Sequence, residues 1–507
     1  MSPLRTATRS DLEKLNIPED TALHIISTNA NPIESRGNPY LEGAHTPLRQ
    51  EIDAPELEVV GEVPADLTGI YLRNGPNQRH DALGVHHWFD GDGMVHGVVI
   101  RDGRISYRNR WVQTRGKAAE DRAGRALWPG LIDPPNPDLE QAWGSDGWLK
   151  DTSNTDVVFH NGKAVTTFYQ CGEPYLLDPY TLETVGTINL EADGARAMSA
   201  HNMVDEHTGE LLFFDYATRP PYMTYGVIGA SGRLEHFTPI DLPGPRLPHT
   251  LAITEHYTIL MDLPLFWDPE LLKQGAHKVK FHREIPSRFG IIPRRGDGDS
   301  IRWFEAEPCY IYHVVNAWEE GDEIVMEGCR FADPEPSQEI RRLYAGPYAN
   351  LLAWMRMDTT WHRWRFDLRT GACREEPLSD RVSEFPMIHA RYNGRPSRYS
   401  YHVTFEEAQT VLFDGLVKYD SQTGATQRYR FGEGCYGSES PFAPRDGARN
   451  EDDGYVVSFV SYPAEDRSEL LVLDARDISA GPVCRARIPH LIPSGFHSCW
   501  VPGDRMP

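Results

Sequence analysis

Short runs in which apolar and polar residues alternate recur along most of the chain. Examples are Gly69-Ile-Tyr-Leu-Arg, Lys163-Ala-Val-Thr-Thr-Phe-Tyr and Gly454-Tyr-Val-Val-Ser-Phe-Val. A period of two is typical of β-strands, whose side chains point alternately to the two faces of a sheet. Helical patterning is confined to a few stretches, such as residues 337–344 and 348–355. The pattern therefore predicts an all-β fold with a few short helices.

A hairpin that opens with Asp is repeated at a nearly constant interval. Asp367, Asp420 and Asp474 each follow an apolar strand, at intervals of 53 and 54 residues, and Asp178 and a looser copy at Ser231 lie 53 residues apart. Asp suits this position because its carboxylate accepts a hydrogen bond from the backbone N–H two residues on. Such intervals are typical of propeller blades, although any all-β protein repeats hairpins to some extent.

The interval divides the chain into an arm and a propeller. Residues 1–55 are expected to form an extended N-terminal arm, and residues 56–507 leave room for about seven blades in a single domain. The content of 43 Gly and 39 Pro agrees with many turns and few long helices.

Composition and charge exclude several classes of partner. The net charge of −23 argues against nucleic acid, because phosphate binding requires a basic surface. Apolar stretches such as residues 253–266 are interrupted by charges before the roughly 20 residues that a spanning helix needs. The first 20 residues lack the apolar core of a secretory signal, and the seven cysteines are scattered without a Cys-x-x-Cys pair. A cytoplasmic location is therefore expected.

Four histidines stand out among the twenty in the chain, because each lies at the edge of an apolar strand. They are His201, His249, His313 and His497. Sequence signatures of zincins, α/β-hydrolases, P-loop proteins and Rossmann folds are absent. One histidine per blade could converge on the propeller axis to hold a metal, but isolated histidines beside apolar residues are more often satisfied core residues. The spacing alone leaves both interpretations open.

Longer motifs resemble the carotenoid cleavage oxygenase family, which includes carotenoid and apocarotenoid dioxygenases, stilbene-cleaving dioxygenases and the retinoid isomerase of the eye. They begin with Asn38-Pro-Tyr-Leu-Glu-Gly and Gly69-Ile-Tyr-Leu-Arg-Asn-Gly-Pro-Asn, and continue through Trp88-Phe-Asp-Gly-Asp-Gly-Met-Val-His. His313-Val-Val-Asn-Ala-Trp-Glu-Glu and the closing Gly495-Phe-His-Ser-Cys-Trp complete the series. The resemblance covers the chain from about residue 38 onward.

The resemblance implies a seven-bladed propeller with a helix and loop cap over an axial non-haem Fe(II). It assigns His201, His249, His313 and His497 as the iron ligands. Imidazole suits Fe(II), and four neutral ligands leave coordination positions open for O2 or substrate. The implied reaction cleaves a conjugated C=C bond of an apocarotenoid or carotenoid-like substrate with O2 into two carbonyl products, with no separate reductant.

Family members also place three glutamates behind the ligating histidines. Two positions match here, Glu384 and Glu439, and the third is Gln170, which by resemblance would face His249. A Gln carbonyl accepts the imidazole N–H without charge, so we expect more labile iron. The alternative is that Gln170 is a neutral replacement without consequence.

The resemblance determines the substrate class less directly than the metal ligands. Stilbene-cleaving members carry a Lys where this chain has Tyr169, which favours an apocarotenoid over a stilbenoid or phenylpropenoid alkene, and a propeller that only binds is a further alternative. An apolar tunnel is expected. Its candidate lining residues are Phe89, Tyr169, Phe266 and Trp318. The stretch 263–272 is interpreted as the tunnel mouth, with at most transient contact with a membrane surface.

Overall fold

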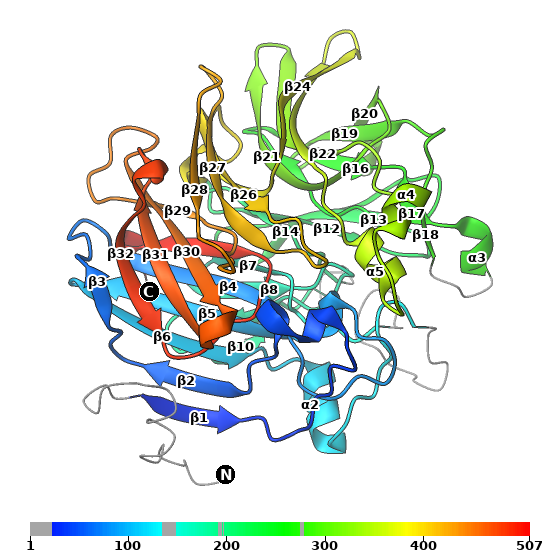
Figure 1. Ribbon diagram of the computed structural model, residues 1–507. Coiled ribbons are helices and arrows are strands. Elements are labelled where there is room, and N and C mark those ends of the chain that lie inside the picture. Colours follow the sequence, from blue (N-terminus) through cyan, green and yellow to red (C-terminus); the bar gives the residue numbers. More distant parts are fainter. Residues whose placement is uncertain (1–22, 134–148, 191–194, 196, 274–277, 507) are drawn as a thin grey trace.

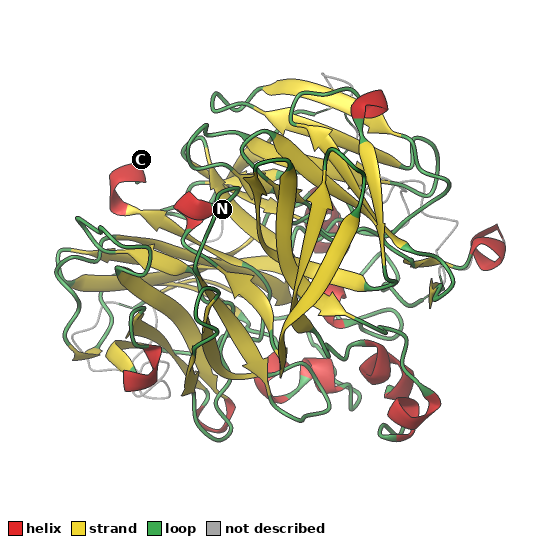
Figure 2. Ribbon diagram, turned by 90° about the horizontal axis from the view of Figure 1, so that it is seen from above, coloured by secondary structure: helices red, strands yellow, loops and turns green. Residues whose placement is uncertain are grey.

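The computed structural model describes residues 23–133, 149–190, 195, 197–273 and 278–506, and within them seven sheets of four or more strands form a ring (Figure 1). The predicted seven-bladed β-propeller is confirmed. One strand of each sheet lies nearest the axis, and these innermost strands contact one another around the ring. For example, β33 contacts β7 and β29, and β21 contacts β15 and β25. Strands fill the interior in Figure 2, with the short helices at its margins.

Each blade is an antiparallel sheet that extends outward from the axis. From the innermost strand outward, the first three blades consist of β33 (Ser498–Pro502), β4 (Gly69–Asn77), β5 (Asp92–Arg101) and β6 (Arg104–Trp111); β7 (Asp156–His160), β8 (Lys163–Thr167), β9 (Tyr175–Leu177) and β10 (Thr184–Thr187); and β11 (Met203–Val204), β12 (Leu211–Tyr216), β13 (Met223–Ile228) and β14 (Leu234–Ile240).

The next four blades follow the same order. They consist of β15 (Ala252–Ile253), β16 (Tyr257–Asp262), β19 (Ser287–Pro293) and β20 (Arg302–Ala306); β21 (Tyr310–Glu320), β22 (Glu323–Phe331), β23 (Thr360–Asp367) and β24 (Cys373–Val382); β25 (Glu384–Met387), β26 (Tyr399–Phe405), β27 (Phe413–Asp420) and β28 (Thr426–Arg430); and β29 (Phe442–Pro444), β30 (Gly454–Tyr462), β31 (Arg467–Asp474) and β32 (Pro482–Ile488).

Two strand exchanges close the ring between its first and last blades. The C-terminal strand β33 pairs with β4 as the innermost strand of blade one, and β3 (Val59–Gly61) pairs with β32 at the outer edge of blade seven. Within the residues predicted as an extended arm, β2 (Gln50–Ala54) and β1 (His24–Thr28) add to the outer edge of blade one. Residues 1–22 of that arm lie outside the described ranges.

Burial follows position within a blade. Middle strands such as β4 and β12 are buried at every residue because neighbouring blades cover both faces, whereas the outer strands β6 and β28 alternate between covered and accessible positions. The core therefore lies between blades; one cluster joins Tyr71 and Val98 of blade one to Phe459 and Val472 of blade seven.

The Asp hairpins connect the third and fourth strands of their blades, as the sequence predicts. The carboxylate of Asp420 accepts hydrogen bonds from the backbone N–H groups of Gln422 and Thr423, at 3.0 and 3.3 Å. Asp367 makes the same pair of bonds between β23 and β24, and Asp178 between β9 and β10. The repeat thus marks the outer hairpin of a blade.

Short helices and loops cap one end of the axis. The predicted helical stretches correspond to α4 (Gln338–Arg342) and α5 (Ala349–Trp354). Leu351 and Leu352 of α5 pack with Tyr40 of η1 (Pro39–Leu41) and Trp88 of η3 (Trp88–Asp90). Helices α2 (Arg115–Ala123) and α3 (Pro269–Lys273) lie further out. No helix in the described ranges is both long and apolar enough to cross a membrane.

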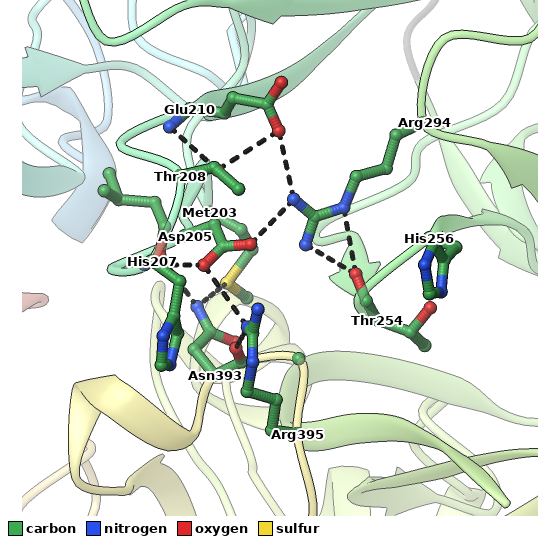
Figure 3. Close-up of polar contacts among 12 residues, drawn as sticks. Met203, Asp205, His207, Thr208, Glu210, Thr254, His256, Arg294, Asn393 and Arg395 are labelled. Carbon is green, nitrogen blue, oxygen red and sulfur yellow. Dashed lines mark hydrogen bonds and ion pairs between the residues drawn. The ribbon is translucent and has the colours of Figure 1, made fainter.

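A polar cluster joins blades further along the inner strands (Figure 3). Asp205, directly after β11, lies between Arg294, at 2.7 Å, and Arg395, at 3.3 Å. Arg294 also donates to the backbone carbonyl of Thr254, after β15, and the Asn393 side chain donates to the carbonyl of Val204. Residues of blades three, four and six are thereby held together around the axis.

Candidate metal centre

Four histidine side chains meet at the capped end of the axis. His201, His249 and His497 lie just before β11, β15 and β33, while His313 lies within β21. The ring centroid of His201 is 4.4 Å from those of both His249 and His497, and 5.0 Å from that of His313. Ligand nitrogens of His201, His249 and His313 all lie within 4.8 Å of one another. The inner strands of different blades thus bring together residues far apart in sequence.

Local backbone irregularities turn two of these rings toward the axis. His201 has a left-handed backbone with φ of 61°, which is uncommon for a residue other than glycine. Its N–H donates to the Asp156 carboxylate at 3.0 Å, which stabilises this conformation. Around His313, the pairing of β21 with β22 shifts register between Ile311 and Val314 and again before Asn316. Such bulges re-aim a side chain out of the regular strand alternation.

The unpaired ring nitrogens fit a metal. The Nε2 atoms of His201 and His313 are buried and have no hydrogen-bond partner among the described residues. A buried polar atom without a partner costs stability unless something binds it. Burial lowers the pKa of His201 and His313 and brings that of His249 to about 3, so these imidazoles are neutral, the form that coordinates metals. The donor set suits a first-row transition metal.

Two glutamates orient the rings from behind. The Glu384 carboxylate forms a very short hydrogen bond with Nδ1 of His313, and Glu439 bonds to Nδ1 of His497 at 3.0 Å. Glu439 also accepts from the Ser498 N–H at 2.6 Å. Burial alone would lower the pKa of His497, but the Glu439 carboxylate raises it above its usual value. With Nδ1 bound to a carboxylate, Nε2 is left for the axis.

Gln170, the third residue predicted to hold a histidine ring, does not show such a hydrogen bond. The Gln170 side chain bonds to the Tyr169 hydroxyl, and among the described residues no hydrogen bond from Gln170 reaches the His249 ring. His249 is instead held by ring contacts, with Tyr312 at 5.0 Å and Tyr169 at 6.0 Å. The role of Gln170 toward His249 stays a prediction.

Asp156 is a site residue that the sequence analysis missed. It starts β7, the inner strand of blade two, and is buried, with one carboxylate oxygen on the His201 N–H and the other on the Val157 N–H. The only available signal was its position at the start of an apolar strand, Asp156-Val-Val-Phe. With Asp156, the inner strand of each of the seven blades, or the segment just before it, contributes a histidine or a carboxylate at this end.

A cavity with an empty volume of about 340 Å³ adjoins the histidines. The predicted residues Phe89 and Tyr169 line it, with their rings 5.1 Å apart. Its other lining side chains, besides the histidines, are Thr155, Tyr312, Met357, Phe385 and Phe496. Three of these directly neighbour a predicted site residue in sequence, as Tyr312 neighbours His313, which is the signal that could have identified them.

Phe266 and Trp318, also expected to line the tunnel, do not line this cavity. Phe266 is buried between His282, with ring centroids 4.1 Å apart, and the Arg246 guanidinium at 4.2 Å. Trp318 lies five residues beyond His313 on β21, about 16 Å along an extended strand, and its indole N–H donates to Glu320.

The stretch 263–272, expected to form the tunnel mouth, is buried in its first half and more accessible in its second half. Residues Leu265–Trp267 form β17, which pairs with β18 (Val279–Phe281), and their side chains are buried. The aromatic residues of this stretch therefore pack inside the protein, and its role as a tunnel mouth stays a prediction.

Comparisons with known proteins agree with this geometry. Residues 45–502 match the family described as retinal pigment epithelial membrane protein. The chain is 34% identical to carotenoid 9,10(9',10')-cleavage dioxygenase 1 of Arabidopsis thaliana, over 92% of this chain and 90% of that protein. It is 32% identical to isoeugenol monooxygenase of Pseudomonas nitroreducens, over 92% and 99%. The lignostilbene dioxygenase structure from Pseudomonas brassicacearum superposes with a TM-score of 0.80 at 29% identity, over 94% and 100%.

Proposed function

The chain belongs to the carotenoid cleavage oxygenase family, and from that premise we propose that it is a non-haem Fe(II) dioxygenase. Its reaction cleaves a conjugated C=C bond of an apocarotenoid or carotenoid-like substrate. Both atoms of O2 are consumed, the C=C bond is broken and two C=O bonds form, so no external reductant is required. The observation that carries the proposal is the buried cluster of four histidines, two of them with unpaired Nε2 atoms, beside an aromatic cavity.

His201, His249, His313 and His497 would hold the iron. Bound Fe(II) supplies a site at which O2 and the alkene react. The chain keeps three of the imidazoles neutral through burial, and Glu384 and Glu439 fix two rings through Nδ1. Neutral ligands leave the charge of the metal largely uncompensated, and the carboxylates behind them hold the rings in place.

The cavity wall selects the substrate and excludes water. Apart from the histidines, it carries aromatic side chains, Met357 and Thr155, and no charged group among the described residues. Flat aromatic faces such as those of Phe385 and Tyr312 suit a planar conjugated chain, and an apolar wall disfavours charged compounds. The wall therefore orients the double bond through apolar and aromatic contacts, without charged side chains.

A stilbenoid or phenylpropenoid alkene is a second candidate substrate, and it stays compatible with the residue that replaces the lysine of stilbene-cleaving relatives. Tyr169 lines the cavity next to the histidines and carries a phenolic hydroxyl, which can bond a substrate phenol. The isoeugenol monooxygenase and the lignostilbene dioxygenase are relatives that match over most of this chain.

A competition experiment tests the proposal. Fe(II)-loaded protein receives an equimolar mixture of an apocarotenal and a hydroxystilbene under air, and mass spectrometry identifies the aldehyde fragments of each. Apocarotenal fragments are expected, and they locate the bond that is cut. Fragments of the stilbene alone would reverse the order of the two candidates. Metal-free protein with an unchanged unfolding transition would instead indicate a propeller that only binds.

A further inference from the structure

A second cavity, called the outer cavity here, adjoins the one at the histidines. It has an empty volume of about 570 Å³ and shares Phe89 and Tyr169 with the inner cavity. These two rings, in an edge-to-face contact at 5.1 Å, form the boundary between the spaces. A molecule that has its double bond at the histidines and is too long for the inner cavity would enter the outer cavity past Phe89 and Tyr169.

The lining of the outer cavity is chemically mixed. Leu83, Leu131, Leu149 and Phe168 supply apolar surface, and the polar lining residues include Gln78, His86, Thr152 and Lys150. This differs from the inner cavity, whose wall apart from the histidines and Thr155 is apolar or aromatic. The outer cavity therefore suits the end of a molecule that combines a hydrocarbon body with a polar group.

Three polar atoms in this lining lack a partner. The Gln78 Oε1, His86 Nδ1 and Thr152 Oγ1 atoms are buried without a hydrogen bond to any described residue. Thr152 is 2% exposed and His86 is 5% exposed. The Gln78 amide nitrogen already donates to the His80 carbonyl at 2.5 Å, which leaves its oxygen as the free end. Buried polar atoms are normally satisfied, so these point to a ligand.

The chemistry of the lining restricts that ligand. The Gln78 oxygen only accepts, whereas a threonine hydroxyl both donates and accepts, so a partner for both must be a donor; a hydroxyl group donates and can also accept. The Lys150 ammonium is already bound by Glu120 at 2.6 Å and Asp92 at 3.1 Å. With two carboxylates on one ammonium and Asp90 also in the lining, a carboxylate ligand would be repelled. A neutral hydroxyl fits best.

The polar region continues into a third cavity. This space, about 230 Å³, shares Gln78 and His86 with the outer cavity and is also lined by His45. Both ring nitrogens of His45 are buried without a hydrogen-bond partner among the described residues. Water or a second oxygen of the ligand can occupy it.

We propose that the outer cavity binds a hydroxyl group at the end of the alkene substrate, through Thr152, Gln78 and His86. The proposal rests on the proposed function and narrows its substrate class to hydroxylated alkenes. A site built to hydrogen-bond a substrate hydroxyl rejects the analogue that lacks it, because the buried groups of the site then remain unpaired.

Anaerobic binding tests this proposal without turnover. Iron-loaded protein is titrated, by quenching of tryptophan fluorescence, with an apocarotenal that bears a hydroxyl on its ring and with the same apocarotenal lacking it. The hydroxylated compound is expected to bind about tenfold more tightly. Thr152→Val, which removes the hydroxyl at nearly constant volume, and Gln78→Leu should reduce this ratio toward one. Thr152→Ser keeps the hydroxyl and should keep the ratio.

The outcomes separate the two proposals. Equal binding of the two compounds by the unsubstituted protein, or an unchanged ratio in both Thr152→Val and Gln78→Leu, would overturn the hydroxyl site even if both compounds are cleaved in air. A tenfold preference that disappears in Thr152→Val would support it, and a lack of cleavage in air would then count only against the proposed reaction. Thermal unfolding of each variant establishes that it is folded.

Discussion

Replacing Glu439 with Gln is expected to weaken metal binding by about 10- to 100-fold. One oxygen of Glu439 accepts from His497 Nδ1 at 3.0 Å, and the other accepts from the Ser498 N–H at 2.6 Å and the Ser498 hydroxyl at 3.2 Å. Gln has one carbonyl oxygen, so its amide N–H₂ must face one of these N–H donors. A buried N–H group without an acceptor costs about 1–3 kcal/mol. If this cost destabilises the metal-bound state, it corresponds to the expected loss of metal affinity.

Competition with a chelator measures the effect. Iron-loaded protein is titrated anaerobically with the chelator, and the iron that remains bound is determined after removal of the small molecules. The matched control is Glu319→Gln, because Glu319 bonds to His256 Nδ1 at 3.0 Å in a pair of the same residue types at the surface. The control should keep its iron. Equal iron retention in Glu439→Gln and Glu319→Gln would refute the argument that the carboxylate behind His497 tunes the metal.

Three further predictions concern the ligands, the missing glutamate and pH. Replacing any one of the four histidines by Ala should abolish turnover and iron binding while circular dichroism shows an intact fold; activity retained in one variant would remove that residue from the ligand set. Gln170→Glu should slow iron loss to a chelator, and unchanged or faster loss would show that residue 170 does not act on His249. Burial raises the pKa of Asp151 from 3.8 to about 7, so the folded state holds a proton that the unfolded chain releases. The free energy of unfolding should therefore fall as pH rises from about 4 to 7, by up to about 1.4 kcal/mol per pH unit, and a denaturation series should show a smaller slope in Asp151→Asn.

The parts of the fold that local chemistry determines were predictable. The hairpins at Asp367 and Asp420 depend on a carboxylate and the N–H groups two and three residues on, all within one turn. Helix α5 could likewise be located from its apolar pattern, because Leu351 and Leu352 fall on the face that packs against the cap. Blade number followed from the hairpin interval.

The site was predictable only through the longer motifs. Ring closure brings His497 of blade one beside His201 of blade three, and no short-range pattern carries that proximity. Phe385 was missed for a different reason. Its backbone is left-handed, with φ of 48°, so the strand alternation breaks there and the ring lies 4.6 Å from that of His313. Phe266, expected at the tunnel, does not line the cavity at the histidines; its ring packs between His282 and Arg246, and aromatic residues beside a strand are most often core.

The position of His497 couples metal binding to completion of the ring. This histidine precedes β33, the strand that closes blade one by pairing with β4, while the other three proposed ligands come from blades three to five. During synthesis, blades two to seven can form before β33 emerges, but the fourth ligand cannot reach the axis until that strand docks. A chain arrested before this point would present three histidines without closure. Iron held at the proposed site would thus report that the first and last blades have joined, so that metal retention would measure complete assembly of the ring.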